Sequence, residues 1–278
     1  MPTLVILLML TSAAIHATTG MLGKSATDRL GFFVGLYCAM GLACLLAIPF
    51  TGTLPADKLW YVGVAILPHI FYNLSTLAMY RQGDLSVVYG ISRGAAPLLV
   101  TTGSFLLLGE WPGWMALAGT VIISVGLFLL VDARALEKPR AVGWAMLTGL
   151  GVAAYSVLGG WGARSSGDVF AFAAHLLALN GLTMVLIGLI RRGPGIFPAM
   201  KAQAKRSVPT GLLVGACYWG VLWALSVAPM GAVSAIRETS VIFAALLGRL
   251  VLKESFGPRR LVAALVVVGG ILVLAFGG

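Results

Sequence analysis

Long apolar stretches are the feature of this sequence that leaves the fewest folds open to it. Ten of them follow one another along the 278 residues, each near the roughly 20 residues that a helix needs to cross the hydrocarbon core of a bilayer. A bilayer admits only helices and closed barrels, because their backbone hydrogen bonds are satisfied internally, and stretches of this length favour helices. The predicted spans are residues 4–23, 30–50, 59–80, 85–108, 113–131, 141–163, 169–190, 207–228, 231–252 and 258–276.

Charged residues are scarce, which supports the same conclusion. They make up 10% of the chain, against about 25% in an average soluble domain, and the mean hydropathy is +0.99. The longest predicted connection, 191–206, is too short for a soluble catalytic domain. No Lys or Arg precedes the first span and equally apolar sequence follows it, so we interpret it as a retained helix rather than a secretory signal. The sequence predicts an all-α integral membrane protein embedded in the lipid bilayer.

The net charge of +10 is explained by membrane orientation. Because the basic residues are dispersed among short connections rather than gathered on one face of a domain, we expect no nucleic-acid partner. Two of them, Lys58 and Arg164, fall in even-numbered connections, and fourteen fall in odd-numbered ones. The positive-inside rule then predicts that the odd connections are cytoplasmic and that both termini lie outside. The fourteen are Lys24, Arg29, Arg81, Arg134, Lys138, Arg140, Arg191, Arg192, Lys201, Lys205, Arg206, Lys253, Arg259 and Arg260.

The second half of the chain repeats the first. Glu110, at the end of the fourth predicted span, corresponds to Glu254 at an offset of 144 residues, and the same offset relates Arg93 to Arg237. Five predicted spans per half is an odd number, so the second copy would cross the membrane in the opposite sense. The two arginines are therefore related by an inverted repeat.

Two segments and one lysine carry a resemblance to a known family. They are LSVVYGISRGAAPLL from Leu85 to Leu99, AIRETSVIFAALLG from Ala235 to Gly248, and Lys24, which stands where many members close their first helix with a lysine. Together they resemble the drug/metabolite transporter superfamily, in its ten-helix EamA branch. In many members a Trp stands at the position of His16.

The resemblance implies ten transmembrane helices, arranged as two inverted five-helix repeats around a central cavity that opens to one side at a time. Residues 1–136 and 137–278 would form the two repeats of one membrane domain. It also implies movement of small metabolites, often outward, across a bacterial inner membrane. Members commonly have both termini in the cytoplasm, which is opposite to the orientation that the charges predict here.

Arg93 and Arg237 lie within predicted spans, where an ionised side chain costs roughly 2.5 to 3.5 kcal/mol on insertion scales. One interpretation is that both guanidinium groups face the cavity and hold a carboxylate, phosphate or phosphonate by paired hydrogen bonds. The other is that each is neutralised by a neighbouring helix and fixes packing. We favour the first, which predicts an anionic or zwitterionic substrate.

Glu238 is the one acid among nine that is predicted at membrane depth. It could couple transport to protons, recognise the amino group of a zwitterion, or form an ion pair with Arg93 or Arg237. Adjacent helical residues point about 100 degrees apart, so we expect Glu238 and Arg237 to face different ways. With one deep acid for two deep arginines, we also expect at least one arginine to lack a carboxylate partner.

Further candidates for the cavity wall are polar or aromatic residues inside spans. Trp219 could stack on a flat ligand or pack against lipid and helices, and His16 could be a hydrogen-bonded packing residue or a proton relay. Buried hydroxyl and amide groups need partners, which adds four more candidates. These are Tyr72, Asn73, Tyr89 and Tyr155.

The sequence contains no metal-binding spacing and no nucleotide-binding motif, so we expect no metal, no cofactor and no use of ATP by this chain. We predict a secondary transporter without enzymatic activity, an exporter of a small polar metabolite, with proton coupling possible and a monomeric or homodimeric state. Two alternatives remain open. One is a membrane enzyme whose arginines clasp the phosphate of a lipid-linked substrate, and the other is a sensor or assembly partner that transports nothing.

Overall fold

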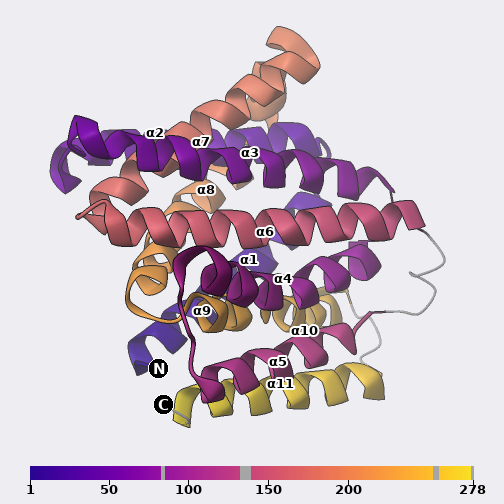
Figure 1. The fold of residues 1–278 in the computed structure, drawn as a ribbon. Helices are drawn as coiled ribbons and strands as arrows, with labels where there is room; N and C mark the ends of the chain where they lie inside the picture. The colour runs from indigo at the N-terminus through magenta and orange to yellow at the C-terminus, as the bar shows by residue number, and fades with distance from the viewer. Residues whose placement is uncertain (83–84, 132–138, 253–256, 277–278) are drawn as a thin grey trace.

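The computed structural model describes residues 1–82, 85–131, 139–252 and 257–276, and each regular element in these ranges is a helix (Figure 1). The helices follow the predicted apolar stretches, with short connections between them. Their bounds are α1 Thr3–Lys24, α2 Arg29–Thr51, η1 Ala56–Lys58, α3 Leu59–Gln82, α4 Leu85–Leu108, α5 Trp114–Phe128, α6 Pro139–Ser165, α7 Val169–Arg192, η3 Gly193–Gly195, α8 Ile196–Val227, α9 Met230–Glu238, α10 Ser240–Leu252 and α11 Pro258–Phe276.

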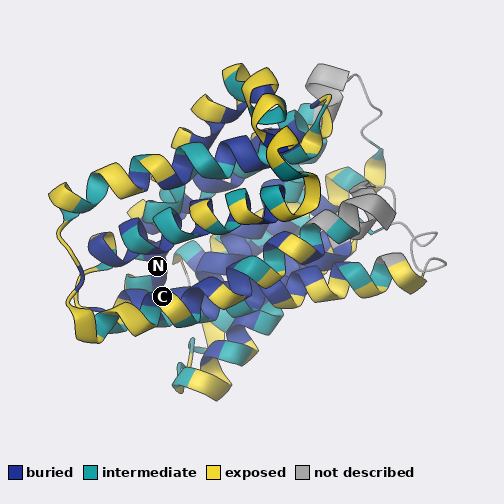
Figure 2. Cartoon of the chain, turned by 90° about the horizontal axis from the view of Figure 1, so that it is seen from above, coloured by how far each residue is buried: buried dark blue, intermediate teal, exposed yellow. Residues whose placement is uncertain are grey.

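Seven segments of the described chain are long and apolar enough to cross a membrane. One of them, Val169–Val227, contains both α7 and α8, while α5 is apolar but shorter and α3 falls outside the set. The outer surface agrees, since large apolar side chains such as Phe50 and Ile190 are 89% and 84% exposed. Figure 2 shows this pattern, with buried residues inside the bundle and exposed residues along the outer faces of the helices. The protein is a multi-pass membrane protein.

Contacts between the two halves of the chain follow a symmetric pattern. In the two halves α1 corresponds to α6, α2 to α7, α3 to α8, and α4 to the pair α9 and α10. The contact of α2 with α8 thus corresponds to that of α7 with α3, and the contact of α3 with α6 to that of α8 with α1. Likewise, the contact of α4 with α6 corresponds to the contacts of α9 and α10 with α1. The pairs α2 with α7, α4 with α9, and α5 with α11 join equivalent helices. A Cβ added at Gly119 would meet Leu274, and one at Gly126 would meet Val267, so α5 and α11 run antiparallel (Figure 1). The second half is therefore packed as an inverted copy of the first.

The loops gather at two ends of the bundle in alternation. Arg164, in the last turn of α6, donates to the carbonyls of Leu225 and Ala228 at the end of α8, and it pairs with Glu110, after α4. At the other end Arg192, the last residue of α7, pairs with Asp28, after α1. The even-numbered connections that are described thus meet at one end, and the odd-numbered ones at the other. Both termini lie at the even end, where the Met1 ammonium donates to the Leu274 carbonyl (Figure 1).

Helix α8 begins eleven residues earlier than its predicted span, so the interpretation of 191–206 as a long connection is wrong. The segment from Ile196 is helical, and Ile196 itself is fully buried against Val34, Met184 and Ile187. Lys201, Lys205 and Arg206 then continue the helix on exposed positions. Hydropathy misses this part because basic residues with good helix propensity extend an apolar helix without being apolar.

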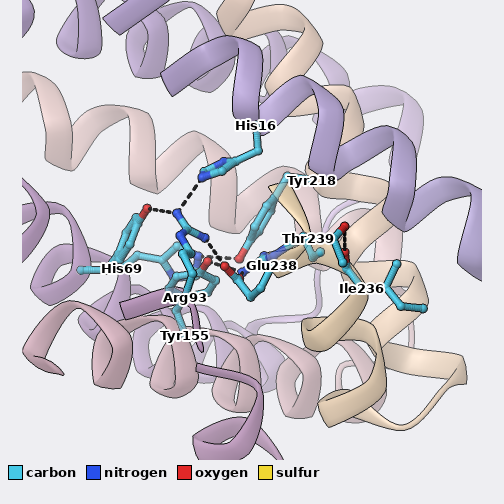
Figure 3. Close-up of polar contacts among 10 residues, drawn as sticks. His16, His69, Arg93, Tyr155, Tyr218, Ile236, Glu238 and Thr239 are labelled. Atoms are coloured by element: carbon cyan, nitrogen blue, oxygen red, sulfur yellow. Dashed lines mark hydrogen bonds and ion pairs between the residues drawn. The ribbon is translucent and has the colours of Figure 1, made fainter. Parts of the chain in front are cut away.

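The predicted span 231–252 is a broken helix rather than a continuous one. Helix α9 ends at Glu238, α10 begins at Ser240, and Thr239 lies between them. The Thr239 hydroxyl donates to the Ile236 carbonyl at 2.6 Å, and its amide bonds the same carbonyl (Figure 3). A threonine side chain that bonds the backbone in this way competes with the regular helical ladder. The break comes directly after the two charged residues of this span.

Candidate functional site

Arg93, Arg237 and Glu238 meet inside the bundle, on α4 and at the end of α9. The Arg93 Nη1 lies 2.6 Å from Glu238 Oε2 (Figure 3). The Arg237 Nη2 lies 3.2 Å from Glu238 Oε1. Arg93 is 3% exposed, Arg237 7% and Glu238 fully buried. One carboxylate therefore bridges the two arginines that the repeat relates.

Two expectations about this cluster are wrong. Glu238 and Arg237 do reach the same point although they are adjacent, because both side chains are long and the helix ends beside them. Neither arginine lacks a carboxylate contact, since each uses a different oxygen of Glu238. Of the open interpretations of Glu238, the ion pair is the one that the structure contains.

Hydrogen bonds connect the cluster to three further helices, α1, α3 and α6. Arg93 Nη2 donates to His16 Nε2 on α1 at 2.6 Å and to the Tyr72 hydroxyl on α3 at 3.4 Å. Arg237 Nη2 donates to the Tyr155 hydroxyl on α6, and its guanidinium lies 5.2 Å from the centre of the Tyr155 ring. Tyr155 thus contacts the cation through both its hydroxyl and its ring face.

The described residues that are both buried and charged are these three, and their sum is one positive charge. An unbalanced charge at this depth is costly unless a ligand or water offsets it. The arrangement is thus able to accept one negative charge without further ionic partners.

Arg237 lines a cavity at the centre of the bundle, together with His16, Tyr72 and Tyr155. A second cavity shares His16 and Tyr72 with the first and extends past Thr19, Phe33 and Thr76. These residues lie toward the end of α1, the start of α2 and the end of α3. Each of these helix ends adjoins an odd-numbered connection. The cavities therefore lead from Arg237 toward the odd end of the bundle.

The even end is held together by the contacts of Arg164. Its guanidinium donates to the carbonyls of Leu225, in the last turn of α8, and Ala228, directly after it, at 2.9 Å each, and it lies 3.1 Å from the Glu110 carboxylate. Glu110 Oε1 in turn accepts from the Met230 amide at the start of α9 at 2.9 Å. The last turn of α6, the connections after α4 and α8, and the first turn of α9 are thus tied together at the end away from the cavities.

The structure brings most of the proposed site residues together, in two layers. His16, Tyr72, Tyr155 and Arg237 line the first cavity, and Asn73 lines the second. Arg93 and Glu238 stand behind this wall, buried against its polar groups.

Two candidates do not join the site. Trp219 is not among the residues lining either cavity, and its ring packs against Phe170 with centroids 6.3 Å apart. Of the two interpretations of Trp219, packing against helices describes its contact in the structure, and its neighbour Tyr218 occupies the position of α8 that faces the first cavity. Tyr89 lies outside the residues whose side chains the structure describes.

Several lining residues are absent from the predicted set, among them His69, Asn180 and Tyr218. His69 Nδ1 donates to the Ala65 carbonyl at 2.8 Å, so in the neutral ring Nε2 accepts from the Tyr218 hydroxyl at 3.0 Å. Asn180 on α7 accepts from the Asn73 amide at 3.1 Å. Each of these residues is a polar residue inside a predicted span, and that was the only signal in the sequence that could have identified it. One sequence does not show which face of a helix lines the cavity.

Comparison with known proteins identifies the family. The model of the EamA-like transporter family matches residues 3–132 and again 139–276, which together make up nearly the whole chain. This chain belongs to the EamA-like transporter family. It is therefore a membrane transporter of the drug/metabolite transporter superfamily, and the resemblance seen in its sequence is confirmed.

One sequence relative and one solved structure are also similar to this EamA-like chain. An uncharacterized protein of Pseudomonas aeruginosa is 30% identical over 246 residues, which are 85% of this chain and 80% of that protein. The crystal structure of another protein aligns with a TM-score of 0.75 over 99% of both chains at 18% identity. The second comparison shows that the whole EamA-like fold, in both repeats, is shared with a crystallised protein.

Proposed function

We propose that this EamA-like transporter carries a small organic anion, or a zwitterion held by its carboxylate, across a bacterial inner membrane by alternating access. It would cross the membrane ten times, counting α9 and α10 as one interrupted span, and would export a metabolite that accumulates in the cell. The observation that carries this proposal is the Arg237 guanidinium in the cavity wall, within a buried cluster of net charge +1. A carboxylate is the natural occupant of such a wall, because a guanidinium offers it two parallel hydrogen bonds.

The shape of the molecule supports alternating access. The cavities lead toward the odd end, whereas Arg164 ties the even end. If the basic odd connections are cytoplasmic, the described state faces the cytoplasm, which suits uptake of a metabolite for export. Opening the even end would require the Arg164 contacts to break.

The test is ligand-induced thermal stabilisation of the purified protein with amino acids, carboxylates, phosphonates, sugars and organic cations. A ligand at about 100 times its Kd stabilises the folded state by about 2.7 kcal/mol if it binds that state alone. We expect carboxylates or zwitterions to stabilise the wild type but not Arg237→Gln. Arg206→Gln, which removes an exposed arginine of α8, is the matched control and should keep the response.

Hits would then be tested for flux in proteoliposomes. Stabilisation by cations or sugars that survives in Arg237→Gln would contradict an anion site. Turnover of a lipid-linked substrate by the purified protein would instead favour an enzyme.

A further inference from the structure

His16 lines both cavities in a form that has no proton on Nε2. The Arg93 Nη2 lies 2.6 Å from this nitrogen, and a guanidinium can only donate, so His16 Nε2 accepts. A protonated imidazole donates from both nitrogens. His16 is thus neutral in the empty site, and proton uptake is incompatible with its present contact to Arg93.

The groups around His16 explain why the empty site resists a second proton. Arg93 and Arg237 are cations, and Glu238 is already bound to both of them. The other polar groups that line the same cavity are neutral; they are Tyr37 on α2, His69 and Tyr72 on α3, and Cys217 and Tyr218 on α8. The described side chains of α10 include no titratable group. Among the described residues, the buried charges near His16 therefore sum to one positive charge.

An anion in the cavity would offset the positive charge around His16 and so favour its protonation. Its oxygens accept hydrogen bonds from Arg237 and from a protonated His16 together, and its negative charge offsets the added proton. We propose that His16 binds a proton together with the substrate anion, so that the protein is a proton–anion symporter. This inference rests on the proposed function, because it needs an anion beside Arg237.

The charges give the symport its stoichiometry. One monovalent anion and one proton add no net charge, so the loaded site keeps the +1 of the empty one. Proton and anion strengthen each other's binding by the same factor, typically about 5 to 150-fold for coupled sites. Outward transport then runs on the metabolite's own gradient, and an inward proton gradient opposes it.

The test is calorimetric binding of L-lactate, pyruvate and L-alanine to the purified protein in two buffers of different ionisation enthalpy. We expect the wild type to take up close to one proton per bound anion near neutral pH. Its affinity should fall by up to about tenfold per pH unit as the pH rises from about 5.5 to about 8. His16→Gln keeps an acceptor for Arg93 but cannot ionise, so it should bind without proton uptake and with an affinity that does not depend on pH.

The controls separate the inference from the proposed function. His175→Gln, on α7 outside both cavities, should behave as the wild type. Anion binding without proton uptake in the wild type, or uptake that survives in His16→Gln and is lost in His69→Gln, overturns the inference and leaves the anion site standing. Binding of none of the three probes, with no difference between the wild type and Arg237→Gln, overturns the proposed function itself.

Discussion

Arg93 of α4 and Glu238 of α9 form a buried ion pair, 2.6 Å between Nη1 and Oε2, that joins the first repeat to the second. Removing one partner of a buried pair typically costs about 3 to 5 kcal/mol, because the remaining charge stays uncompensated. Glu238→Gln leaves two arginines facing each other, so we expect a large drop in the melting temperature of the purified protein.

The double variant Arg93→Gln with Glu238→Gln restores the net charge of +1. We expect it to be more stable than the sum of the two single changes predicts, with a coupling of about 0.5 to 3 kcal/mol. Additive losses in this cycle would mean that the pair contributes little beyond its separate side chains.

Cys217 reports which end of the cavity is open. It lines the first cavity, whereas Cys38 and Cys44 do not. In a Cys38→Ser, Cys44→Ser background, we expect a membrane-impermeant thiol reagent to label Cys217 from the side of the odd connections. Inside-out and right-side-out vesicles distinguish the two sides.

Arg164→Gln should add labelling of Cys217 from the even side, because Arg164 binds α8 and Glu110 at that end. Unchanged labelling in this variant would show that the even end is closed by packing rather than by Arg164.

Asp28 makes stability depend on acid pH. Partial burial alone would raise its pKa, but the Gly31 amide and the Arg192 guanidinium outweigh this and hold the pKa below its usual value. A pKa that is lowered on folding contributes stability above the unfolded value of about 3.9, and this contribution is lost as the pH falls through the folded pKa.

Asp28→Ala also removes the N-cap of α2, a loss of about 1 kcal/mol, while Asp28→Asn keeps a capping oxygen and loses only the exposed pair. We expect the difference between wild type and Asp28→Asn to shrink below about pH 4. A constant difference from acid to neutral pH in thermal unfolding would refute this role of the charge.

Gly41 and Gly181 let α2 and α7 pack with their backbones in contact. A Cβ at Gly41 would lie 2.8 Å from the Gly181 Cα. Gly41→Ala should therefore destabilise the protein by about 1 to 3 kcal/mol, as overpacked cores do. Gly63→Ala on α3, where nothing lies within 4 Å, should be neutral or slightly stabilising. Equal effects of the two changes in thermal unfolding would argue against the close approach.

Hydropathy and the internal repeat predict the helices and their inverted order, because the bilayer imposes both span length and apolar composition. Arg93 and Arg237 stand out for the same reason, as ionised groups where the solvent is lipid. Hydropathy does not predict the helix break at Thr239, because the break depends on a hydrogen bond from the Thr239 hydroxyl to a backbone carbonyl. Hydropathy also does not predict that Tyr218 rather than Trp219 lines the cavity, because the neighbouring helices determine which side of an apolar helix faces the cavity.

The length of α8 has a consequence for how the protein sits in its membrane. Its 32 residues rise about 48 Å, against a hydrocarbon thickness of about 30 Å, so an upright α8 overruns the core by about 18 Å. Its first turns carry the exposed Lys201, Lys205 and Arg206, which anionic headgroups attract. An upright α8 therefore places these basic first turns beyond the hydrocarbon core, at the level of the lipid headgroups beside the odd-numbered connections.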